Sequence, residues 1–136
     1  MIPASPDRVW EYLRRISSHV EWMTDAVAIR FSSEQTEGVG TAFETDTKVG
    51  PLRLTDKMLI TEWEPQQAMG IRHTGVVTGT GRFTLSPSSA TGTRFTWEED
   101  LHFPVWMGGA LGGVAGAPVL KRIWQRNLAN LSRHFE

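Results

Sequence analysis

The chain has 136 residues, a length that favours one domain with a hydrophobic core over residues 1–136. Its formal net charge is −1, so it lacks the basic excess that nucleic-acid-binding proteins carry. The sequence contains no cysteine, which excludes disulfides, iron–sulfur clusters, thiolate zinc sites and cysteine nucleophiles.

The first residues read as the end of a strand followed by a helix. Ile2 and Pro3 resemble the tail of a strand whose beginning is missing. The run Ser5-Pro6-Asp7 then favours a helix start, with serine as the cap and proline in the first turn. A second short helix is predicted over residues 18–23. The first helix should bury the apolar side chains at helical spacing, Val9, Trp10, Leu13 and Ile16.

From Ala26 onward the apolar residues alternate with a period of two, which indicates strands. No helical pattern separates them, so neighbouring strands should pair as antiparallel hairpins. Gly79 and Gly81 fall inside a strand and predict a bend or a close approach of another group to the backbone. The strand from Ala26 should be followed by strands over residues 41–49, 52–64, 69–74, 76–86 and 93–103, with breaks at Gly50-Pro51 and over residues 87–92.

The last stretch, residues 117–136, contains the most regular helical pattern of the chain. Pro118 suits its first turn. A broad apolar stripe needs a covering surface, and only the strands can supply one, so we expect a curved antiparallel sheet around a helix over residues 118–135. The stripe consists of Leu120, Ile123, Trp124, Leu128, Leu131 and Phe135, of which Leu120, Trp124, Leu128 and Leu131 should be buried.

This order of elements resembles the helix-grip fold of the START-like superfamily, also called SRPBCC. Within it the chain is similar to the polyketide cyclase/dehydrase and lipid-transport group, although the usual full first strand is almost absent here. The resemblance implies a deep apolar cavity between the sheet and the last helix, for a lipid, a polyketide or a similar molecule. The residues that carry it are Ile2-Pro3-Ala4-Ser5-Pro6-Asp7-Arg8-Val9-Trp10, Glu21-Trp22-Met23, Gly38-Val39-Gly40-Thr41, Ile60-Thr61-Glu62-Trp63-Glu64-Pro65, Gly81-Arg82-Phe83 and Gly92-Thr93-Arg94-Phe95-Thr96-Trp97.

Side chains alternate across a strand, so the apolar phase of each predicted strand identifies the wall of that cavity. Trp106 lies in a glycine-rich segment, residues 104–113, that suits either a lid over the cavity or close packing on the sheet. Trp97 and Trp106 should flank the opening. The ligand-binding candidates are Trp97, Trp106, Phe83, Phe43, Met58, Ile71, Leu101, Trp124 and Leu128.

Four polar residues share the inward phase: Glu99, His73, Asp56 and Glu62. A carboxylate on an apolar face must be paired, protonated or at the wet mouth of a pocket. A carboxyl beside an imidazole is suited to general acid–base work, so Glu99, His73 and Asp56 are the catalytic candidates for a polyketide cyclase or dehydratase. The structural alternatives are a bulge that turns Glu99 outward, cross-strand ion pairs for the other acids and an exposed His73.

The remaining sequence patterns concern cofactors, membrane insertion and cellular location. The four histidines form no metal-binding spacing, and no glycine-rich phosphate loop or G-x-S-x-G elbow is present, so we expect no metal and no cofactor. The uncharged stretch 103–120 contains five glycines and two prolines, which argues against a membrane span. No basic-then-apolar leader opens the sequence, so we expect a cytoplasmic protein without stable membrane insertion or a nucleic-acid partner, and leave a homodimer open.

Three functions remain. The leading one is the binding of a hydrophobic small molecule in the cavity. The second is the cyclase or dehydratase, and the third is a protein-interaction module. A dry apolar cavity would favour binding, a carboxyl and an imidazole in contact would favour catalysis, and an exposed apolar patch would favour a protein partner.

Overall fold

The computed structural model describes residues 1–49, 52–88, 91–102 and 116–136. The predicted break at Gly50-Pro51 lies outside the described residues, as do residues 89–90 of the predicted break over 87–92 and the glycine-rich segment with Trp106. The elements in chain order are α1 (Pro6–Leu13), the 3-10 helix η1 (Ile16–Glu21), β1 (Ala26–Phe31), β2 (Ala42–Val49), β3 (Leu52–Glu64), β4 (Ala68–Thr74), β5 (Thr78–Pro87), β6 (Thr93–His102) and α3 (Gly116–His134).

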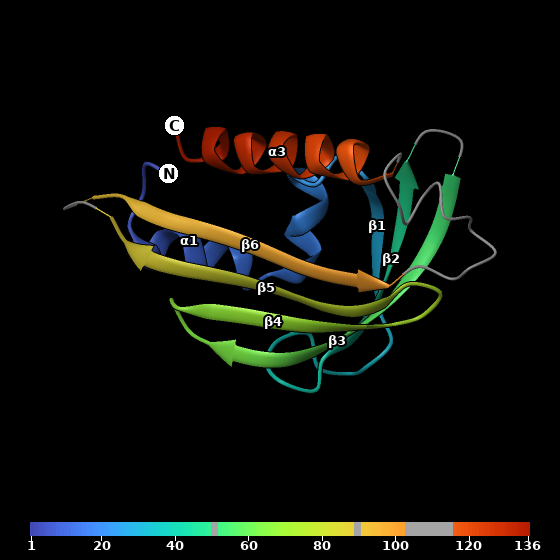
Figure 1. The fold of residues 1–136 in the computed structure, drawn as a ribbon. Coiled ribbons are helices and arrows are strands. Elements are labelled where there is room, and N and C mark those ends of the chain that lie inside the picture. The colour runs from blue at the N-terminus through green and yellow to red at the C-terminus, as the bar shows by residue number, and fades with distance from the viewer. Residues whose placement is uncertain (50–51, 89–90, 103–115) are drawn as a thin grey trace.

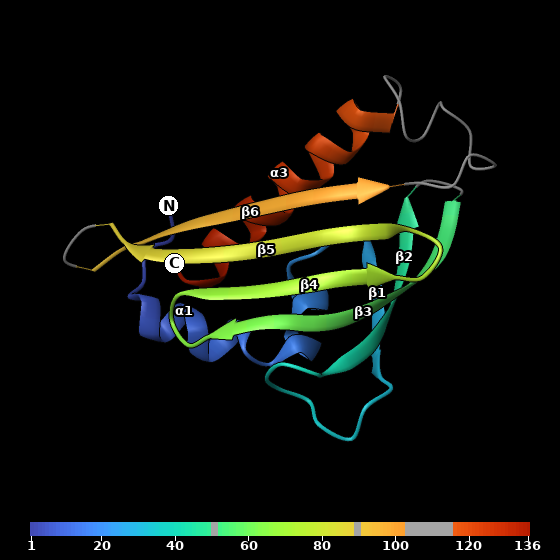
Figure 2. The ribbon, with the colours of Figure 1, turned by 60° about the horizontal axis from the view of Figure 1, so that its bottom comes forward.

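The six strands form one antiparallel sheet in the order of the sequence, β1-β2-β3-β4-β5-β6. Each strand thus pairs with its neighbour in the chain, as predicted. β1 and β2 run across the direction of β5 and β6, so the sheet is strongly curved (Figures 1 and 2). The helix α3 lies on the same side of the sheet as α1 and η1 (Figure 1), which confirms the expected helix-grip arrangement.

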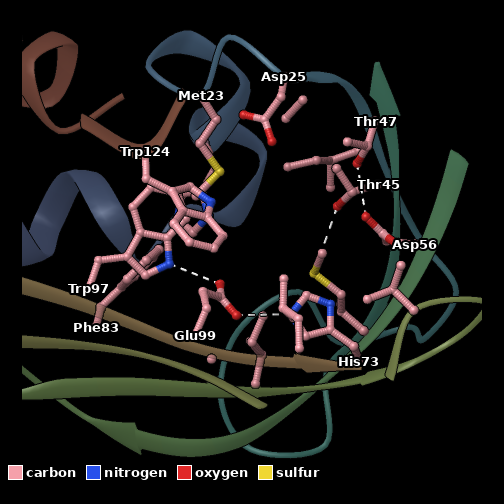
Figure 3. Close-up of a pocket in the computed structure, with 18 of the residues that line it drawn as sticks. Met23, Asp25, Thr45, Thr47, Asp56, His73, Phe83, Trp97, Glu99 and Trp124 are labelled. Carbon is pink, nitrogen blue, oxygen red and sulfur yellow. Dashed lines mark hydrogen bonds and ion pairs between the residues drawn. The ribbon is translucent and has the colours of Figure 1, made fainter. Parts of the chain in front are cut away.

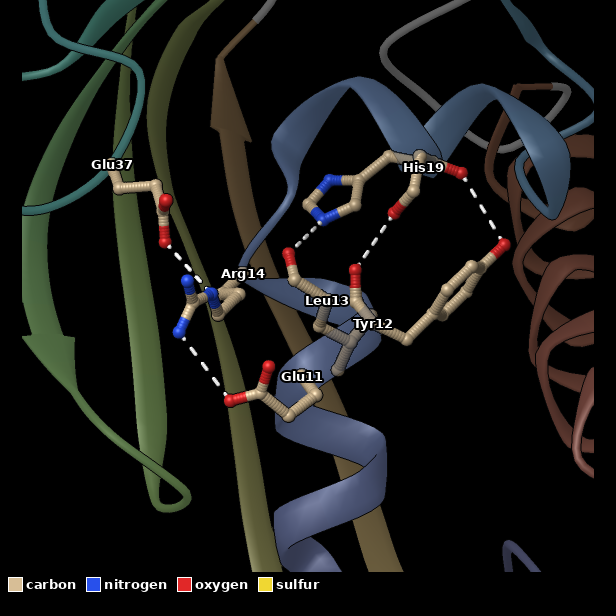
Figure 4. Close-up of polar contacts among 7 residues, drawn as sticks. Glu11, Tyr12, Leu13, Arg14, His19 and Glu37 are labelled. Carbon is tan, nitrogen blue, oxygen red and sulfur yellow. Dashed lines mark hydrogen bonds and ion pairs between the residues drawn. The ribbon is translucent and has the colours of Figure 1, made fainter.

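The first helix follows the predicted capping pattern. Ser5 has an extended backbone and its side chain accepts a hydrogen bond from the Arg8 N–H at 3.4 Å. Four side chains of α1 are buried, and Ile16, which begins η1 rather than ending α1, is 1% exposed. Ser18 ties the two segments together, because its hydroxyl donates to the Tyr12 carbonyl oxygen at 3.0 Å (Figure 4).

A bulge in β3 changes which face its side chains occupy. The pairing with β4 steps from Ile60↔Ile71 to Glu62↔Gly70, so Thr61 has no partner of its own. Residues before the bulge keep the predicted phase, but Glu62 turns to the outer face and pairs with Arg82 at 2.7 and 3.0 Å. The expectation that Glu62 faces inward is therefore wrong, and the added residue is the physical reason.

The last helix also differs in part from its prediction. Its bounds shift by two residues at the start and one at the end, which is ordinary at helix termini. The side chain of Pro118 lies outside the description. Leu131 is fully buried as predicted, but Leu120, Trp124 and Leu128 are only half-buried. Leu120 and Trp124 face a cavity instead of a filled core, which accounts for their exposure.

The N-terminal segment closes the edge of the sheet near the C-terminus. Ile2 is 3% exposed and forms an antiparallel bridge with Thr93 at the start of β6. Ser132 Oγ donates to the Met1 carbonyl oxygen at 3.0 Å, so the two chain ends meet (Figures 1 and 2). No helix within the described parts of the chain has the length and hydropathy that a membrane crossing needs.

Candidate functional site

A cavity of about 350 Å³ lies between the concave face of the sheet, η1 and α3. This volume is within the range of small-molecule sites. Its lining is mostly apolar and includes aromatic and methionine side chains from the sheet, from the segment after η1 and from α3 (Figure 3). The apolar lining residues are Met23, Ala26, Ile29, Phe43, Val49, Leu54, Met58, Ile60, Met69, Ile71, Val77, Phe83, Trp97, Leu101, Leu120 and Trp124.

The strand phases predicted most of this lining. β2 contributes Phe43, Thr45 and Thr47, and the inward residues of β4, β5 and β6 follow the same alternation. Seven of the nine ligand-binding candidates line the cavity: Trp97, Phe83, Phe43, Met58, Ile71, Leu101 and Trp124. Leu128 is not among the described lining residues, because the cavity contacts of α3 come from Leu120 and Trp124 in its first half. Trp106 lies outside the described residues.

His73 and Glu99 contact each other on the wall formed by β4 and β6. His73 Nε2 lies 3.2 Å from Glu99 Oε2, and Trp97 Nε1 donates to Glu99 Oε1 at 2.9 Å (Figure 3). The side chains of His73 and Glu99 are only 6% and 9% exposed. Both oxygens of Glu99 are thus engaged, Oε1 by Trp97 and Oε2 by His73. Glu99 thus fixes the orientation of the His73 ring.

Gly81 makes room for the carboxylate of Glu99. The two residues lie opposite each other in the β5–β6 ladder. A Cβ at position 81 would lie 2.5 Å from Glu99 Oε2 and 2.8 Å from its Cδ. Real Cβ atoms essentially never lie so close to another atom, so a side chain at position 81 would displace the carboxylate of Glu99 from this place over the backbone. This is the close approach that a glycine inside the strand predicted.

Asp56 is the third polar group of the wall. It accepts a hydrogen bond from Thr47 Oγ1 at 2.9 Å through Oδ2, and 9% of the residue is exposed. Burial raises the pKa of Asp56, although the Thr47 hydrogen bond and the nearby His73 act in the opposite direction. Asp56 Oδ1 and His73 Nδ1 are buried and have no hydrogen-bond partner among the described residues.

One polar corner of the cavity was missed by the sequence patterns. Asp25 follows η1, and its Oδ1 accepts a hydrogen bond from Asn127 Nδ2 at 2.8 Å. Asn127 is fully buried in α3, and its Oδ1 accepts from the N–H and hydroxyl of Thr24 at 2.9 and 3.0 Å. An apolar-stripe pattern cannot identify a buried asparagine, and Asp25 lies in a turn without periodicity. His19, which no sequence pattern singles out, also lines the cavity.

The polar groups around the cavity do not form a metal site. Within the described ranges, no three His, Asp or Glu side chains gather as metal ligands would. The arrangement instead offers an oriented imidazole, a buried carboxyl with a raised pKa and an apolar space in front of them. Such a set can bind a polar group of an apolar molecule or exchange a proton with it.

Comparison with known proteins places the fold and the family. The chain matches, over residues 1–136, the family described as polyketide cyclase / dehydrase and lipid transport. No curated protein matches the sequence.

Solved structures share the fold at low sequence identity. The hypothetical protein jhp0584 from Helicobacter pylori is 15% identical, with a TM-score of 0.76, 100% of this chain covered and 83% of that one. The protein TTHA0849 from Thermus thermophilus is also 15% identical, with a TM-score of 0.74 and coverage of 97% and 90%. The di-domain ARO/CYC StfQ of the steffimycin biosynthetic pathway is 14% identical, with a TM-score of 0.74 and coverage of 98% and 47%.

Proposed function

Because this chain belongs to the polyketide cyclase/dehydrase and lipid transport family, we propose that it binds a hydrophobic small molecule in the cavity between the sheet and α3. The observation that carries the proposal is the cavity itself. Its apolar walls enclose a space that a closely packed core would fill with side chains. A space of about 350 Å³ enclosed by aromatic, aliphatic and methionine side chains suits an apolar ligand of modest size. Burial of the ligand's apolar surface supplies the affinity.

An uncharged fluorescent probe such as Nile red tests the proposal. It should bind once per chain and quench tryptophan emission, because Trp97 and Trp124 line the cavity with their ring centroids 5.9 Å apart. Trp124→Ala should raise the dissociation constant about tenfold or more, because removal of an aromatic wall loses at least about 1.4 kcal/mol of contact.

Trp63→Ala is the matched control. Trp63 packs edge-on against Trp10 at 5.1 Å and is not among the described lining residues. Its removal should therefore leave the affinity of the folded protein unchanged. Equal affinity in the parent and in both variants would place the probe elsewhere and refute the proposed site.

A second candidate is catalysis by a polyketide cyclase or dehydratase, which the contact between His73 and Glu99 favours. Glu99 would orient the ring, and His73 Nδ1 would accept a proton from carbon between two carbonyl groups. Asp56, whose pKa is raised by burial, would protonate the oxygen that leaves as water. Glu99 is then a positioning residue, because its own oxygens are occupied by Trp97 and His73.

The protein-interaction module receives no comparable support. The large apolar side chains that are exposed in the described residues are Met1, Val27, Val39 and Val76, which come from four different segments. A homodimer, the lack of a nucleic-acid partner and the absence of a cofactor stay predictions.

A further inference from the structure

The charged groups that line the cavity are unevenly distributed. Three carboxyl groups line it, those of Asp25, Asp56 and Glu99. Among the described lining residues the one arginine or lysine is Arg82, and two hydrogen bonds to Glu62 hold its guanidinium on the outer face of the sheet. The residues that the structure does not describe contain no charged side chain in the sequence. Among the described residues, no lysine or arginine side chain is therefore free to meet a ligand in this cavity.

This distribution disfavours an anionic ligand. A carboxylate head inside an apolar cavity must exchange its hydration for a cation or several donors. Here it would meet apolar walls and side chains that are themselves acids. For a fatty acid or another organic acid, burial of the apolar body would favour binding. The loss of hydration at its carboxylate would cost more free energy than this burial contributes.

The polar wall instead offers two buried polar atoms, Asp56 Oδ1 and His73 Nδ1, that have no hydrogen-bond partner among the described residues. Glu99 engages Nε2 of His73, so the Nδ1 of the ring is left for a hydrogen bond to a ligand. Asp56 accepts the Thr47 hydroxyl through Oδ2, which leaves its Oδ1 for a hydrogen bond to a ligand. The residues His73 and Asp56 are 7% and 9% exposed, and both lie on the same wall of the cavity (Figure 3).

A hydroxyl group is the simplest group that donates and accepts at once. We propose that the ligand of this cavity is an uncharged apolar molecule that carries a hydroxyl group, held between Asp56 and His73, and that carboxylates are excluded. This inference rests on the binding function proposed above and specifies its ligand class. It also satisfies two buried polar atoms that otherwise lack partners.

Three naphthalenes that differ only in one substituent test the inference. The probes are 2-naphthol, 2-methylnaphthalene and 2-naphthoate, and their affinities are measured near neutral pH by displacement of Nile red. The naphthol should bind at least about tenfold more tightly than the naphthoate and several-fold more tightly than the methyl compound, whose substituent has a similar size.

Asp56→Leu should abolish the preference for the naphthol over the methyl compound, because leucine has a similar shape and no polar atom. Asp100→Leu is the control, because the Asp100 side chain is 79% exposed, and it should leave the preference intact. The comparison of the three ligands needs no variant, so it decides the question even where a variant does not fold.

The outcomes separate this inference from the function on which it rests. If neither Nile red nor any naphthalene binds, the binding function itself fails. If the probes bind but the naphthoate equals or exceeds the naphthol, or the methyl compound equals the naphthol, the binding function stands and the ligand class proposed here is wrong. A preference that persists in Asp56→Leu likewise overturns the assignment of the hydroxyl position.

Discussion

His19 is a buried imidazole bound to the backbone of α1. Its Nε2 lies 2.9 Å from the Leu13 carbonyl oxygen, and 6% of the residue is exposed (Figure 4). Burial lowers the pKa of His19 to about 4, because apolar surroundings disfavour the imidazolium, and the Leu13 hydrogen bond offsets only part of this effect. The folded protein thus binds this proton more weakly than the unfolded chain, whose histidine pKa is about 6.5.

We therefore expect His19 to make the protein less stable as the pH falls from about 6.5 towards 4. In that window the unfolded chain binds more protons than the folded one, so acid favours unfolding. A change from about pH 7.5 to about pH 5 should cost about 2 kcal/mol through this residue. Urea unfolding at both pH values measures the loss, which should be smaller by that amount in His19→Gln.

Asp56 titrates in the opposite sense and does not disturb this comparison. Its raised pKa means that the folded protein holds the proton more firmly, so its contribution is present at low pH and is lost as the pH rises through the folded pKa. The contribution is common to the parent and to His19→Gln and cancels in the difference. An identical pH dependence of the two proteins would show that His19 ionises in the fold.

Individual side chains of the cavity could be predicted where strand alternation places them. His73, Glu99 and Asp56 share the phase of their apolar neighbours, and all three line the cavity. The alternation could not predict that Trp97 and His73 both contact Glu99, because their order along the strand does not give their rotamers. Nor could it find Asp25, which lies in a turn.

At the scale of elements, the bulge in β3 marks the limit of such patterns. The phase of β3 holds for Leu54, Asp56, Met58 and Ile60 and then reverses at Thr61. No glycine or proline occurs between residues 52 and 64 that would indicate the bulge. The register depends on how many residues of β3 pair with each residue of β4. This pairing is a property of both strands, so the sequence of β3 alone does not give it. The bulge moves Glu62 to the surface and turns Trp63 towards Trp10.

The attachment of α3 to the turn before β1 depends on Asn127. Its side chain makes three hydrogen bonds in a fully buried position, two to Thr24 and one to Asp25. Asn127→Ala should lower the free energy of unfolding by about 2–4 kcal/mol, because it removes three hydrogen bonds and leaves the Thr24 N–H and an Asp25 carboxyl oxygen without this partner. Equilibrium urea unfolding measures the change.

Asn130→Ala is the matched control on the same helix. Asn130 is half-buried, and its Nδ2 donates one longer bond to the Trp22 carbonyl oxygen at 3.3 Å. The helix propensity gained by changing asparagine to alanine is the same at both sites, so it cancels in the comparison. Asn130→Ala should cost less than about 1 kcal/mol. Similar costs for the two variants would show that α3 is not held through Asn127.

At the scale of the whole molecule, both chain ends contribute to one core. The buried apolar cluster joins Ile2, residues of α1 and η1, the inner face of the sheet and Leu131 of α3. Tyr12 extends this contact to the last residues, because its ring stacks on His134 at 3.9 Å and meets Phe135 edge-on at 5.6 Å. The curved sheet and the covering helix could be predicted from periodicity. The meeting of the chain ends could not, because it depends on contacts more than a hundred residues apart.

From this shared core we predict that residues 1–136 unfold as one domain even though α3 borders a cavity. Leu131 is fully buried within the cluster, so Leu131→Ala should cost about 2–5 kcal/mol. Because the cluster includes both the helix and the sheet, the loss should shift one cooperative transition and not detach α3 alone. Far-ultraviolet circular dichroism reports all elements, and tryptophan fluorescence reports chiefly the sheet and the cavity wall. Their urea midpoints should coincide in the parent and in the variant. An earlier loss of helical signal in Leu131→Ala, with the fluorescence transition unmoved, would mean that α3 docks as a separate unit.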